Sequence, residues 1–502
     1  MRLVFLAIGC VRIGLPTCLA GESRGAVIDV GDRKQLLLDS TLIATSRGVH
    51  LTMNPPTQTT ECLVTTDQPW ETSSGALVWS YNTVRKEDGR IRLWYHLITL
   101  KKDTMGRDPQ AAGECVAYAE STDGLRFAKP ILGLHEFAGS RQNNVVLPTC
   151  RGAAVWVDPQ APPSHRYRTQ TKGAKGLLTF HHSPDGIRWE QTRALSIGDC
   201  DTQSLVFWDD PIRRYVLYTR TWVRHPDRRK NYRCHRRMES DDLVHWDGEV
   251  IVMKADSVDL GTYSTPTGQP PVDYYGACVF KYPDAQGVYI MLAQAFWHAF
   301  DRTPANELGP DRMDVRLAVS RDGQRFDRVG GRMPFLRLGP EGSWYSRTIW
   351  AIPEPIRMGD ELWVYFCGAN LDHTGYPDPS ANGRYLTGIG RAVLRLDGFV
   401  SLDADYAGGE FTTPLVRFKG NALVLNVDTS AGGCVWVEIL DENDTPIPGF
   451  TESQCRPISG NSVRMPVSWT DKADLGTLAG KPVRLRFRMR DCKLYAFQFS
   501  RP

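Results

Sequence analysis

A seven-residue phrase that returns along the chain constrains the fold more than any other feature. It reads Ser-Thr-Asp-Gly-Leu-Arg-Phe from residue 121, recurs from residues 183, 240 and 320, and has a shorter copy, Leu-Asp-Gly-Phe-Val, from residue 396. Its aspartates lie 57 to 80 residues apart, at Asp123, Asp185, Asp242, Asp322 and Asp397. Asp-Gly favours a tight turn, because glycine accepts positive φ and aspartate bonds its own backbone. Repetition at this period predicts one supersecondary unit used five times, for which a β-propeller blade fits.

Alternating and apolar runs predict four strands in each repeat. The innermost strands are expected over residues 76–84, 153–157, 204–208, 277–282 and 348–352, and the second strands over residues 91–97, 166–170, 215–221, 288–295 and 362–367. Long loops follow the second strand in four repeats, at residues 99–113, 222–232, 298–314 and 369–384. We therefore predict a five-bladed β-propeller over residues 67–405, with the Asp-Gly turns on one face and the long loops, where function usually resides, on the other.

The two ends of the chain differ in texture from the repeats. Residues 1–20 carry an early arginine, an apolar stretch and small residues before Gly21, which predicts a signal peptide and a secreted or periplasmic protein. Residues 21–66 are expected to form an N-terminal strand region that closes the ring or packs on the propeller. Residues 410–502 contain short strand-like runs separated by turn clusters, which predicts a β-sandwich domain. The expected fold class is all-β.

Charge and cysteine usage narrow the classes of partner. Lys and Arg number 60 against 57 Asp and Glu, so the net charge of +3 does not point to nucleic acid or to an anionic membrane surface. No segment after residue 20 has the roughly 20 apolar residues that a membrane span needs. The cysteines lie singly, without a Cys-x-x-Cys pair or zinc-type histidine spacing, so we expect no metal and no other cofactor. Disulfide pairing stays open.

Acidic side chains are expected at the hub, where the innermost strands begin. Glu71 precedes the first of these strands, Asp201 the third and Asp273 the fourth. Because the three strands enter the hub from the same rim, we expect their acids to converge on the face opposite the Asp-Gly turns. The alternative for each is a solvated loop acid or a strand-start cap. If they converge, Glu71 is the expected general acid, Asp201 the base or nucleophile, and Asp273 an orienting group.

Aromatic and cationic side chains are expected at the same rim, mainly at the ends of the second strands. The candidate substrate-binding residues are Trp70, His96, Arg220, Trp222, Trp297, His298 and His373. Rings can stack on the C–H faces of sugars, and the guanidinium of Arg220 can hold a carboxylate or a sugar hydroxyl. The alternative for Trp222 and Trp297 is packing between blades. For His298 and His373 it is an ordinary surface position.

The five phrases, the strand order and the C-terminal module resemble the five-bladed propeller glycoside hydrolases, relatives of families 32, 43 and 68, in which S-x-D-G-x-x-W turns recur. The resemblance covers roughly residues 67–403. It implies carboxylates on inner strands at the funnel mouth. The invertase-type motif W-M-N-D-P-N-G is absent, and the nearest text, Met53-Asn54-Pro55-Pro56, lacks its aspartate. The resemblance therefore implies the architecture and the carboxylate chemistry, not those motif residues.

These observations favour a glycoside hydrolase that acts on an oligo- or polysaccharide. A non-catalytic carbohydrate-binding propeller is the alternative, and a protein-interaction propeller with a flat aromatic or apolar rim is a third option. The arrangement of carboxyl groups separates the first two. Two acids within roughly 5 to 10 Å that face a pocket would favour hydrolysis, whereas one acid or none would favour binding.

Overall fold

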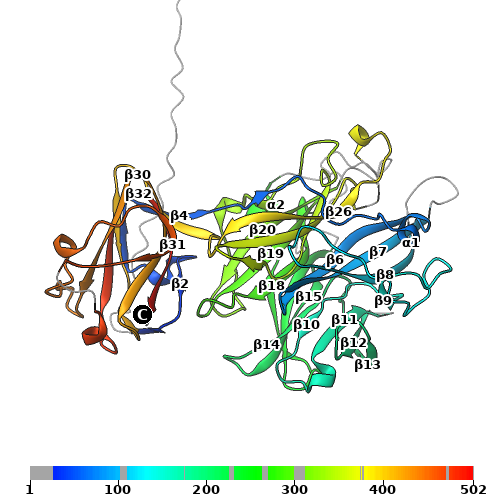
Figure 1. The fold of residues 1–502 in the computed structure, drawn as a ribbon, viewed down its shortest axis with the longest axis horizontal. Coiled ribbons are helices and arrows are strands. Elements are labelled where there is room, and N and C mark those ends of the chain that lie inside the picture. Colours follow the sequence, from blue (N-terminus) through cyan, green and yellow to red (C-terminus); the bar gives the residue numbers. More distant parts are fainter. Residues whose placement is uncertain are drawn as a thin grey trace, which may run out of the picture.

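The computed structural model describes residues 27–101, 110–173, 176–224, 231–262, 270–298, 311–373, 375, 378–470 and 474–500 (Figure 1). The predicted signal peptide, residues 1–20, lies outside these ranges. Within them the fold is almost entirely β, and its α-helices are α1 (Pro69–Thr72) and α2 (Ser257–Leu260). None of the described helices has the length and hydropathy of a membrane span. Figure 1 shows a smaller part, which contains the C-terminal strands, beside a larger part built from the repeats.

Three antiparallel sheets of four strands follow one another along the chain. Their strands lie side by side in sequence order, as repeated antiparallel units require. The first sheet contains β6 (Ala76–Glu87), β7 (Arg90–Lys101), β8 (Gln110–Ser121) and β9 (Val145–Pro148). The second contains β10 (Trp156–Val157), β11 (Tyr167–Lys172), β12 (Leu177–Ser183) and β13 (Glu190–Ser196). The third contains β14 (Leu205–Asp209), β15 (Arg214–Arg224), β16 (Asn231–Ser240) and β17 (Asp247–Met253).

The fourth and fifth units share one ten-stranded sheet. The fourth unit contains β18 (Val272–Lys281), β19 (Tyr289–Trp297), β20 (Arg312–Ser320), β21 (Asp327–Arg328) and β22 (Pro334–Leu336). The fifth contains β23 (Thr348–Ala351), β24 (Ile356–Met358), β25 (Glu361–Ala369), β26 (Thr387–Arg395) and β5 (Thr57–Gln58). A parallel pairing of Met313 with Thr348 joins the two units. The short strand β5 pairs with β26, so an N-terminal segment provides the outermost strand of the last unit.

The repeated phrase forms the same turn in four of the units. In the first, the Ser121 hydroxyl accepts from the backbone N–H of Gly124, and the Asp123 carboxylate accepts from those of Leu125 and Arg126. The same bonds recur around Asp185, Asp242 and Asp322. Asp397 differs, because it is fully buried and binds Lys34, Tyr282 and Asn426. All five repeat aspartates are therefore structural.

Each turn contacts the preceding unit, and the first turn contacts the fifth unit. Four contacts are hydrogen bonds, and in the third turn Leu243 shares an apolar cluster with the second unit. The pairs are Gly124 with Tyr365, Gly186 with Trp94, Leu243 with Trp156, Gly323 with Tyr218, and Asp397 with Tyr282. The aromatic residue of the phrase packs in the same direction, for example Phe127 against Tyr365. The five units therefore contact one another in a closed cycle.

The innermost strands of all five units line one narrow cavity. Its lining includes Thr83 of β6, Ala154 beside β10, Val206 of β14, Val279 of β18 and Pro353 after β23. Strands from segments 270 residues apart thus meet around a common centre. Large apolar clusters fill the space between neighbouring units.

Replacement of Gly124 by alanine should destabilise the protein by about 2 to 4 kcal/mol. Gly124 has φ +74°, and a Cβ there would lie 2.7 Å from the Tyr365 hydroxyl and under 3 Å from Ile91 and Trp363, so backbone strain adds to overpacking. Gly89→Ala is the matched control, because Gly89 also has φ +74° but nothing lies within 4 Å of its added Cβ. We expect the control to cost about 1 kcal/mol. Urea unfolding of both variants measures the difference, and equal losses would contradict tight docking of the turn.

The C-terminal strands form an eight-stranded sheet that includes N-terminal strands. Its members are β27 (Val400–Ala404), β28 (Gly409–Thr412), β30 (Ala422–Leu440), β31 (Asn461–Pro466), β32 (Arg484–Ser500), β2 (Gln35–Leu36), β3 (Thr45–Arg47) and β4 (Val49–Met53). Strand β1 (Ile28–Gly31) pairs in parallel with β29 (Val416–Phe418). The described N-terminal strands, over residues 28–58, therefore divide between the C-terminal part and the fifth unit. The β-sandwich itself stays a prediction.

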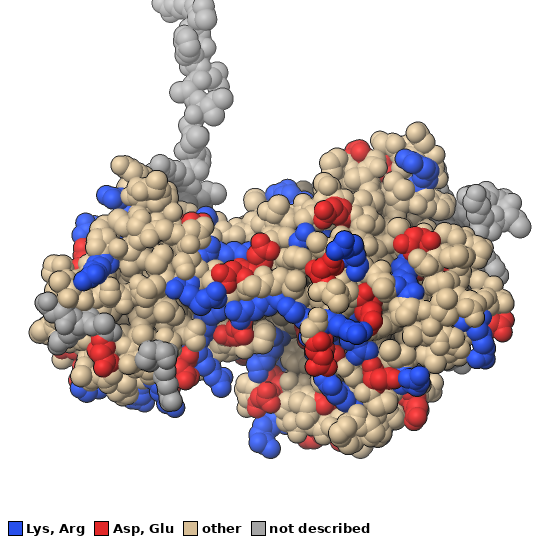
Figure 2. All heavy atoms as spheres, viewed as in Figure 1, with Lys and Arg blue, Asp and Glu red and all other residues tan. Residues whose placement is uncertain are grey.

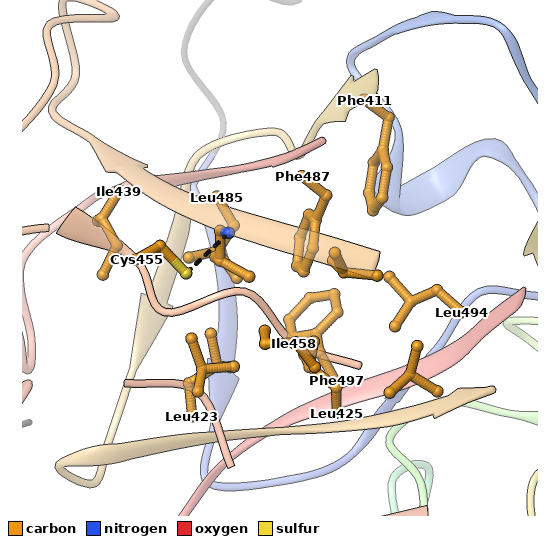
Figure 3. Close-up of a cluster of buried hydrophobic side chains, with 14 of the residues drawn as sticks. Phe411, Leu423, Leu425, Ile439, Cys455, Ile458, Leu485, Phe487, Leu494 and Phe497 are labelled. Atoms are coloured by element: carbon orange, nitrogen blue, oxygen red, sulfur yellow. Dashed lines mark hydrogen bonds between the residues drawn. The ribbon is translucent and has the colours of Figure 1, made fainter. Parts of the chain in front are cut away.

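The core of the C-terminal part is aromatic and aliphatic. Figure 3 shows Phe411, Phe487 and Phe497 gathered with Leu425 and Leu494. The rings of Phe411 and Phe487 stack with centroids 4.6 Å apart. The ten described cysteines are free, and nine of them are buried. On the face drawn in Figure 2, basic and acidic side chains of the described residues are interspersed.

Candidate functional site

A cluster of charged side chains lies at the end of the units away from the Asp-Gly turns. In the first unit, Ser121 of the turn pairs with Ile91, whereas Glu114 pairs with Ile98 towards the opposite end of β7. The third unit follows the same pattern, because Arg233 pairs with Trp222 far from the turn. This is the rim predicted for the long loops. Much of those loops lies outside the described residues.

Arg151 joins two carboxylates within this cluster. Its Nε lies 2.9 and 2.7 Å from the carboxylate oxygens of Glu114, and its Nη1 lies 3.8 Å from Oδ1 of Asp201. His96 also approaches Glu114, with its Nε2 3.3 Å from Oε2 of the carboxylate. Burial alone would raise the pKa of Glu114, but hydrogen bonds with His96 and Arg151 lower it to about 2. Glu114 is therefore ionised at neutral pH.

Asp201 meets three cationic side chains. Besides Arg151, it contacts Lys172, and Nη2 of Arg220 lies 3.0 Å from its Oδ2. The same Arg220 nitrogen lies 3.2 Å from Asp199. The Asp201 side chain is 28% exposed, whereas that of Arg220 is 5% exposed, so the carboxylate is the more accessible partner. Burial, followed by the charges of Arg151 and Arg220, lowers the pKa of Lys172.

Asp273 lies deeper, in a second group of polar side chains. It is 2% exposed, with Nη1 of Arg233 3.1 Å and Nε2 of His298 3.5 Å from its Oδ2. Burial would raise the pKa of Asp273, but His298 and Arg233 lower it. Burial would lower the pKa of His298, but hydrogen bonds with Asp273 and Asp311 raise it. Asp273 is thus ionised, and His298 is biased towards its charged form.

Aromatic rings connect the two groups. The guanidinium groups of Arg220 and Arg233 lie 5.1 and 4.9 Å from the Trp222 ring, and 5.7 and 5.1 Å from the Tyr275 ring. His373 packs edge-on against Tyr275, with centroids 4.8 Å apart. Burial and then the charge of Arg233 lower the pKa of His373 to about 4. Trp222 is 39% exposed, so it offers an open ring beside the charged cluster.

The structure thus brings together most of the residues predicted from the sequence. Those in or beside the cluster are His96, Asp201, Arg220, Trp222, Asp273, His298 and His373. The network draws on strands and on connections alike: His96, Arg220 and Asp273 lie on strands, whereas Asp201, His298 and His373 lie in connections between strands.

Glu71 lies outside these contacts. It belongs to α1 and is fully buried, and it accepts hydrogen bonds from the backbone N–H groups of Asp67 and Gln68 at 3.0 and 3.1 Å. Its other contacts are the Tyr95 hydroxyl at 2.7 Å and Nζ of Lys129 at 2.8 Å. No described contact links Glu71 to Asp201 or Asp273. The short helix turns its carboxylate towards the helix N-terminus and Lys129, so it caps the helix.

Two predicted tryptophans also have structural contacts. Trp70, next to Glu71, is buried and donates from Nε1 to Asn144 at 3.0 Å. Trp297 donates to Asp314 at 3.3 Å and lies under the guanidinium of Arg316 at 5.3 Å. Neither is described in contact with the charged cluster. Both partners of Trp297 lie on β20 of its own unit, so packing between blades stays a prediction for this residue.

Sequence reasoning missed several members of the cluster as site residues: Tyr81, Glu114, Arg151, Lys172, Arg233 and Tyr275. The rule applied to the sequence looked for acids only before innermost strands, and Glu114 lies on the third strand of its unit. A charged residue at the edge of an apolar run was the available signal. Glu114 directly precedes the buried run 115–119, and Arg151 directly precedes the buried run 152–156.

No family model and no curated protein matches the chain. An N-acetylgalactosamine deacetylase from F. plautii in complex with blood group B trisaccharide is 16% identical, with 70% of this chain and 96% of that chain covered and a TM-score of 0.43. A β-1,2-mannobiose phosphorylase from Listeria innocua is 14% identical, with coverage of 68% and 97% and a TM-score of 0.45. An exo-inulinase from Aspergillus awamori is 11% identical, with coverage of 87% and 99% and a TM-score of 0.37. The structural neighbours thus include five-bladed propeller glycoside hydrolases and phosphorylases as well as the deacetylase, all at low sequence identity.

Proposed function

We propose that the five units are the blades of a five-bladed β-propeller and that the chain is a glycoside hydrolase acting at the rim of its hub. The cyclic contacts between turns and preceding units support the first part, as does the cavity lined by all five innermost strands. The second part depends on the charged cluster. At TM-scores below 0.5 the structural neighbours do not carry a function over to this chain.

The proposal depends chiefly on one observation: a single guanidinium lies between two carboxylates. Arg151 contacts both Glu114 and Asp201, so the carboxylates are separated by the width of that group. Glycosidases place two carboxyl groups about 5 to 10 Å apart across the scissile bond. The open ring of Trp222 next to Arg220 supplies a face on which a sugar can stack.

The electrostatics of the pair divide the roles. Glu114 is ionised, since its pKa is lowered to about 2, and this suits a base or nucleophile. Asp201 and Lys172 form the proposed proton-donating pair. The pKa of Lys172 is lowered, so its ammonium group releases a proton more readily than an ordinary lysine does. This assignment replaces the role of general acid expected for Glu71. Asp273 keeps the proposed orienting role, through Arg233 and His298.

The charge balance of the cluster favours a neutral saccharide. The cations Arg151, Lys172, Arg220 and Arg233 face the anions Glu114, Asp199, Asp201 and Asp273. A sugar hydroxyl can accept from the former and donate to the latter. An acidic sugar would add an uncompensated negative charge to an already neutralised group.

A non-catalytic carbohydrate-binding propeller is the second candidate. One observation favours it: Glu114, Asp199, Asp201 and Asp273 are each paired with a cation. Neither Glu114 nor Asp273 can serve as a proton donor, since the pKa of each is lowered.

Secretion or a periplasmic location is also part of the proposal, and it depends on the sequence of residues 1–20 alone.

A screen of the purified protein tests the proposal. The panel contains neutral and acidic 4-nitrophenyl glycosides and neutral plant and algal oligosaccharides, and tryptophan fluorescence reports binding in parallel. We expect cleavage of at least one neutral glycoside. Binding without cleavage would favour the second candidate, and cleavage confined to acidic glycosides would overturn the neutral-substrate assignment.

A further inference from the structure

Tyr81 has a backbone conformation that a bulky residue rarely adopts. Its φ is +73°, and it lies in an excursion of β6 where pairing with β7 skips from Trp79 to Thr83. The excursion is held in place, because Asn82 donates to the Trp79 carbonyl at 2.7 Å and accepts from the His96 N–H at 2.9 Å. Positive φ on a tyrosine costs about 1 kcal/mol or more and persists where surrounding contacts enforce it, often at functional sites.

A second excursion brings Tyr275 to the same place. Pairing of β18 with β19 skips from Tyr274 to Ala277. The Gln294 side chain fills the space beside Gly276, where an added Cβ would lie 2.3 Å from its Oε1. The Tyr275 ring packs edge-on against Phe296, with centroids 5.7 Å apart. Both excursions are therefore braced from their own units.

The two tyrosines meet between the charged cluster and the narrow cavity that the innermost strands of all five units line. Tyr81 interacts electrostatically with Tyr275, Arg151 and Arg220, and its ring lies 5.8 Å from that of His96. Thr83 of β6, two residues after Tyr81, and Val279 of β18, four residues after Tyr275, line the cavity shared by all five innermost strands. Both tyrosines are buried. They therefore separate the rim, where the carboxylates lie, from the cavity below.

We infer that Tyr81 and Tyr275 form the floor of the saccharide site and hydrogen-bond to hydroxyls of the innermost sugar. This inference rests on the proposed function and adds the residues that set the depth of the site. Each of two inner strands has a bulge, and the backbone of the first is strained at Tyr81; such bulges would lift a phenol towards the substrate. An unstrained strand would place the side chain of residue 81 according to the regular alternation.

The phenol of Tyr81 acts as a hydrogen-bond donor and acceptor without titrating. Burial, and then Tyr275, raise its pKa well above the usual value. It therefore stays protonated across the pH range in which the carboxylates of the cluster are ionised. Removal of its hydroxyl should weaken substrate binding while the shape of the pH–rate profile stays unchanged.

Tyr81→Phe and Tyr275→Phe test the inference, each with Tyr118→Phe as a control. Tyr118 is also buried, but its hydroxyl bonds to Arg92 and Glu120 on β7 and β8, away from the cluster. With the 4-nitrophenyl glycoside that the wild type cleaves fastest, we expect each test variant to lower kcat/KM by roughly tenfold. The pH profile should be unchanged and the urea midpoint should shift no more than in the control.

The outcomes separate this inference from the proposed function. Wild-type kcat and KM in both folded variants would show that Tyr81 and Tyr275 do not form the floor of the saccharide site. If the wild type binds a panel oligosaccharide without cleaving any glycoside, hydrolysis fails, and the floor is then judged by a roughly tenfold rise in Kd. An unchanged Kd would overturn it. A wild type that neither cleaves nor binds any panel member overturns both.

Discussion

Glu114→Gln and Asp201→Asn should each lower kcat/KM on a cleaved glycoside by about a thousandfold or more. Each change keeps the size of the side chain but removes a carboxyl group, and positioned acid or base groups contribute about 10²- to 10⁴-fold in rate. The two carboxylates share Arg151, so the effects should be strongly non-additive in the double variant. Steady-state kinetics together with urea unfolding separate loss of chemistry from loss of fold.

Glu120→Gln is the control for this pair of variants. Glu120 is on the same strand as Glu114, but it is paired with Arg90 at 2.8 Å near the surface. We expect its kcat/KM to stay within about twofold of wild type, because an exposed ion pair contributes little. Near-normal rates in folded Glu114→Gln and Asp201→Asn would place the site elsewhere. Loss in Asp201→Asn alone would show that Glu114 is not its catalytic partner.

Lys129→Met should destabilise the protein by about 3 to 5 kcal/mol. The Lys129 side chain is 3% exposed and that of Glu71 is fully buried, so the change leaves an uncompensated buried carboxylate. The double variant Glu71→Gln/Lys129→Met should regain most of this loss, since neither charge then remains. Urea or thermal unfolding measures the free energy of unfolding of the wild type, of Lys129→Met and of the double variant. A loss no larger than that of the control described next would contradict a buried ion pair.

Arg90→Met is the matched control, because it breaks an ion pair in the same unit whose partners are 60% and 31% exposed. We expect a cost of at most about 1 kcal/mol. Activity gives a second test of Glu71. If it only caps α1 and pairs with Lys129, the folded Glu71→Gln variant should keep near-wild-type kcat/KM. A loss of several hundredfold would restore the catalytic role first expected from its position in the sequence.

The repeated units could be predicted from the sequence because their signals are local. Each Asp-Gly turn is specified within seven residues, and its serine and aspartate bond to the backbone of that same stretch. The roles of Asp397 and of β5 could not be predicted in the same way. Asp397 binds Lys34, and β5 pairs with β26, more than 300 residues away along the chain. Such pairings depend on how the whole chain closes.

The candidate site was predictable only in part, for a similar reason. Asp201 and Asp273 lie where inner strands begin, so the predicted strand positions were enough to nominate them. Glu114 enters the site from a third strand, away from the starts of the innermost strands, and its pairing with Arg151 identifies it as a member of the cluster. Glu71 was mislocated although a local signal existed. Gln68-Pro69-Trp70-Glu71 has proline at the first helical position and glutamate at the third, which is the signature of a capped helix N-terminus.

The division of the N-terminal segment has a consequence for how the chain reaches its native state. Strands β2 and β4 pair with β32 and β27, and β5 pairs with β26, so the first strands made wait for the last. The C-terminal part needs β32 and cannot be completed while the chain is still being synthesised, whereas the fifth unit needs only β26, which ends at Arg395. Contacts of this sequence separation slow folding, because a long loop must close before they form. We expect a late, concerted step that joins both parts, after which the chain resists unfolding from either end.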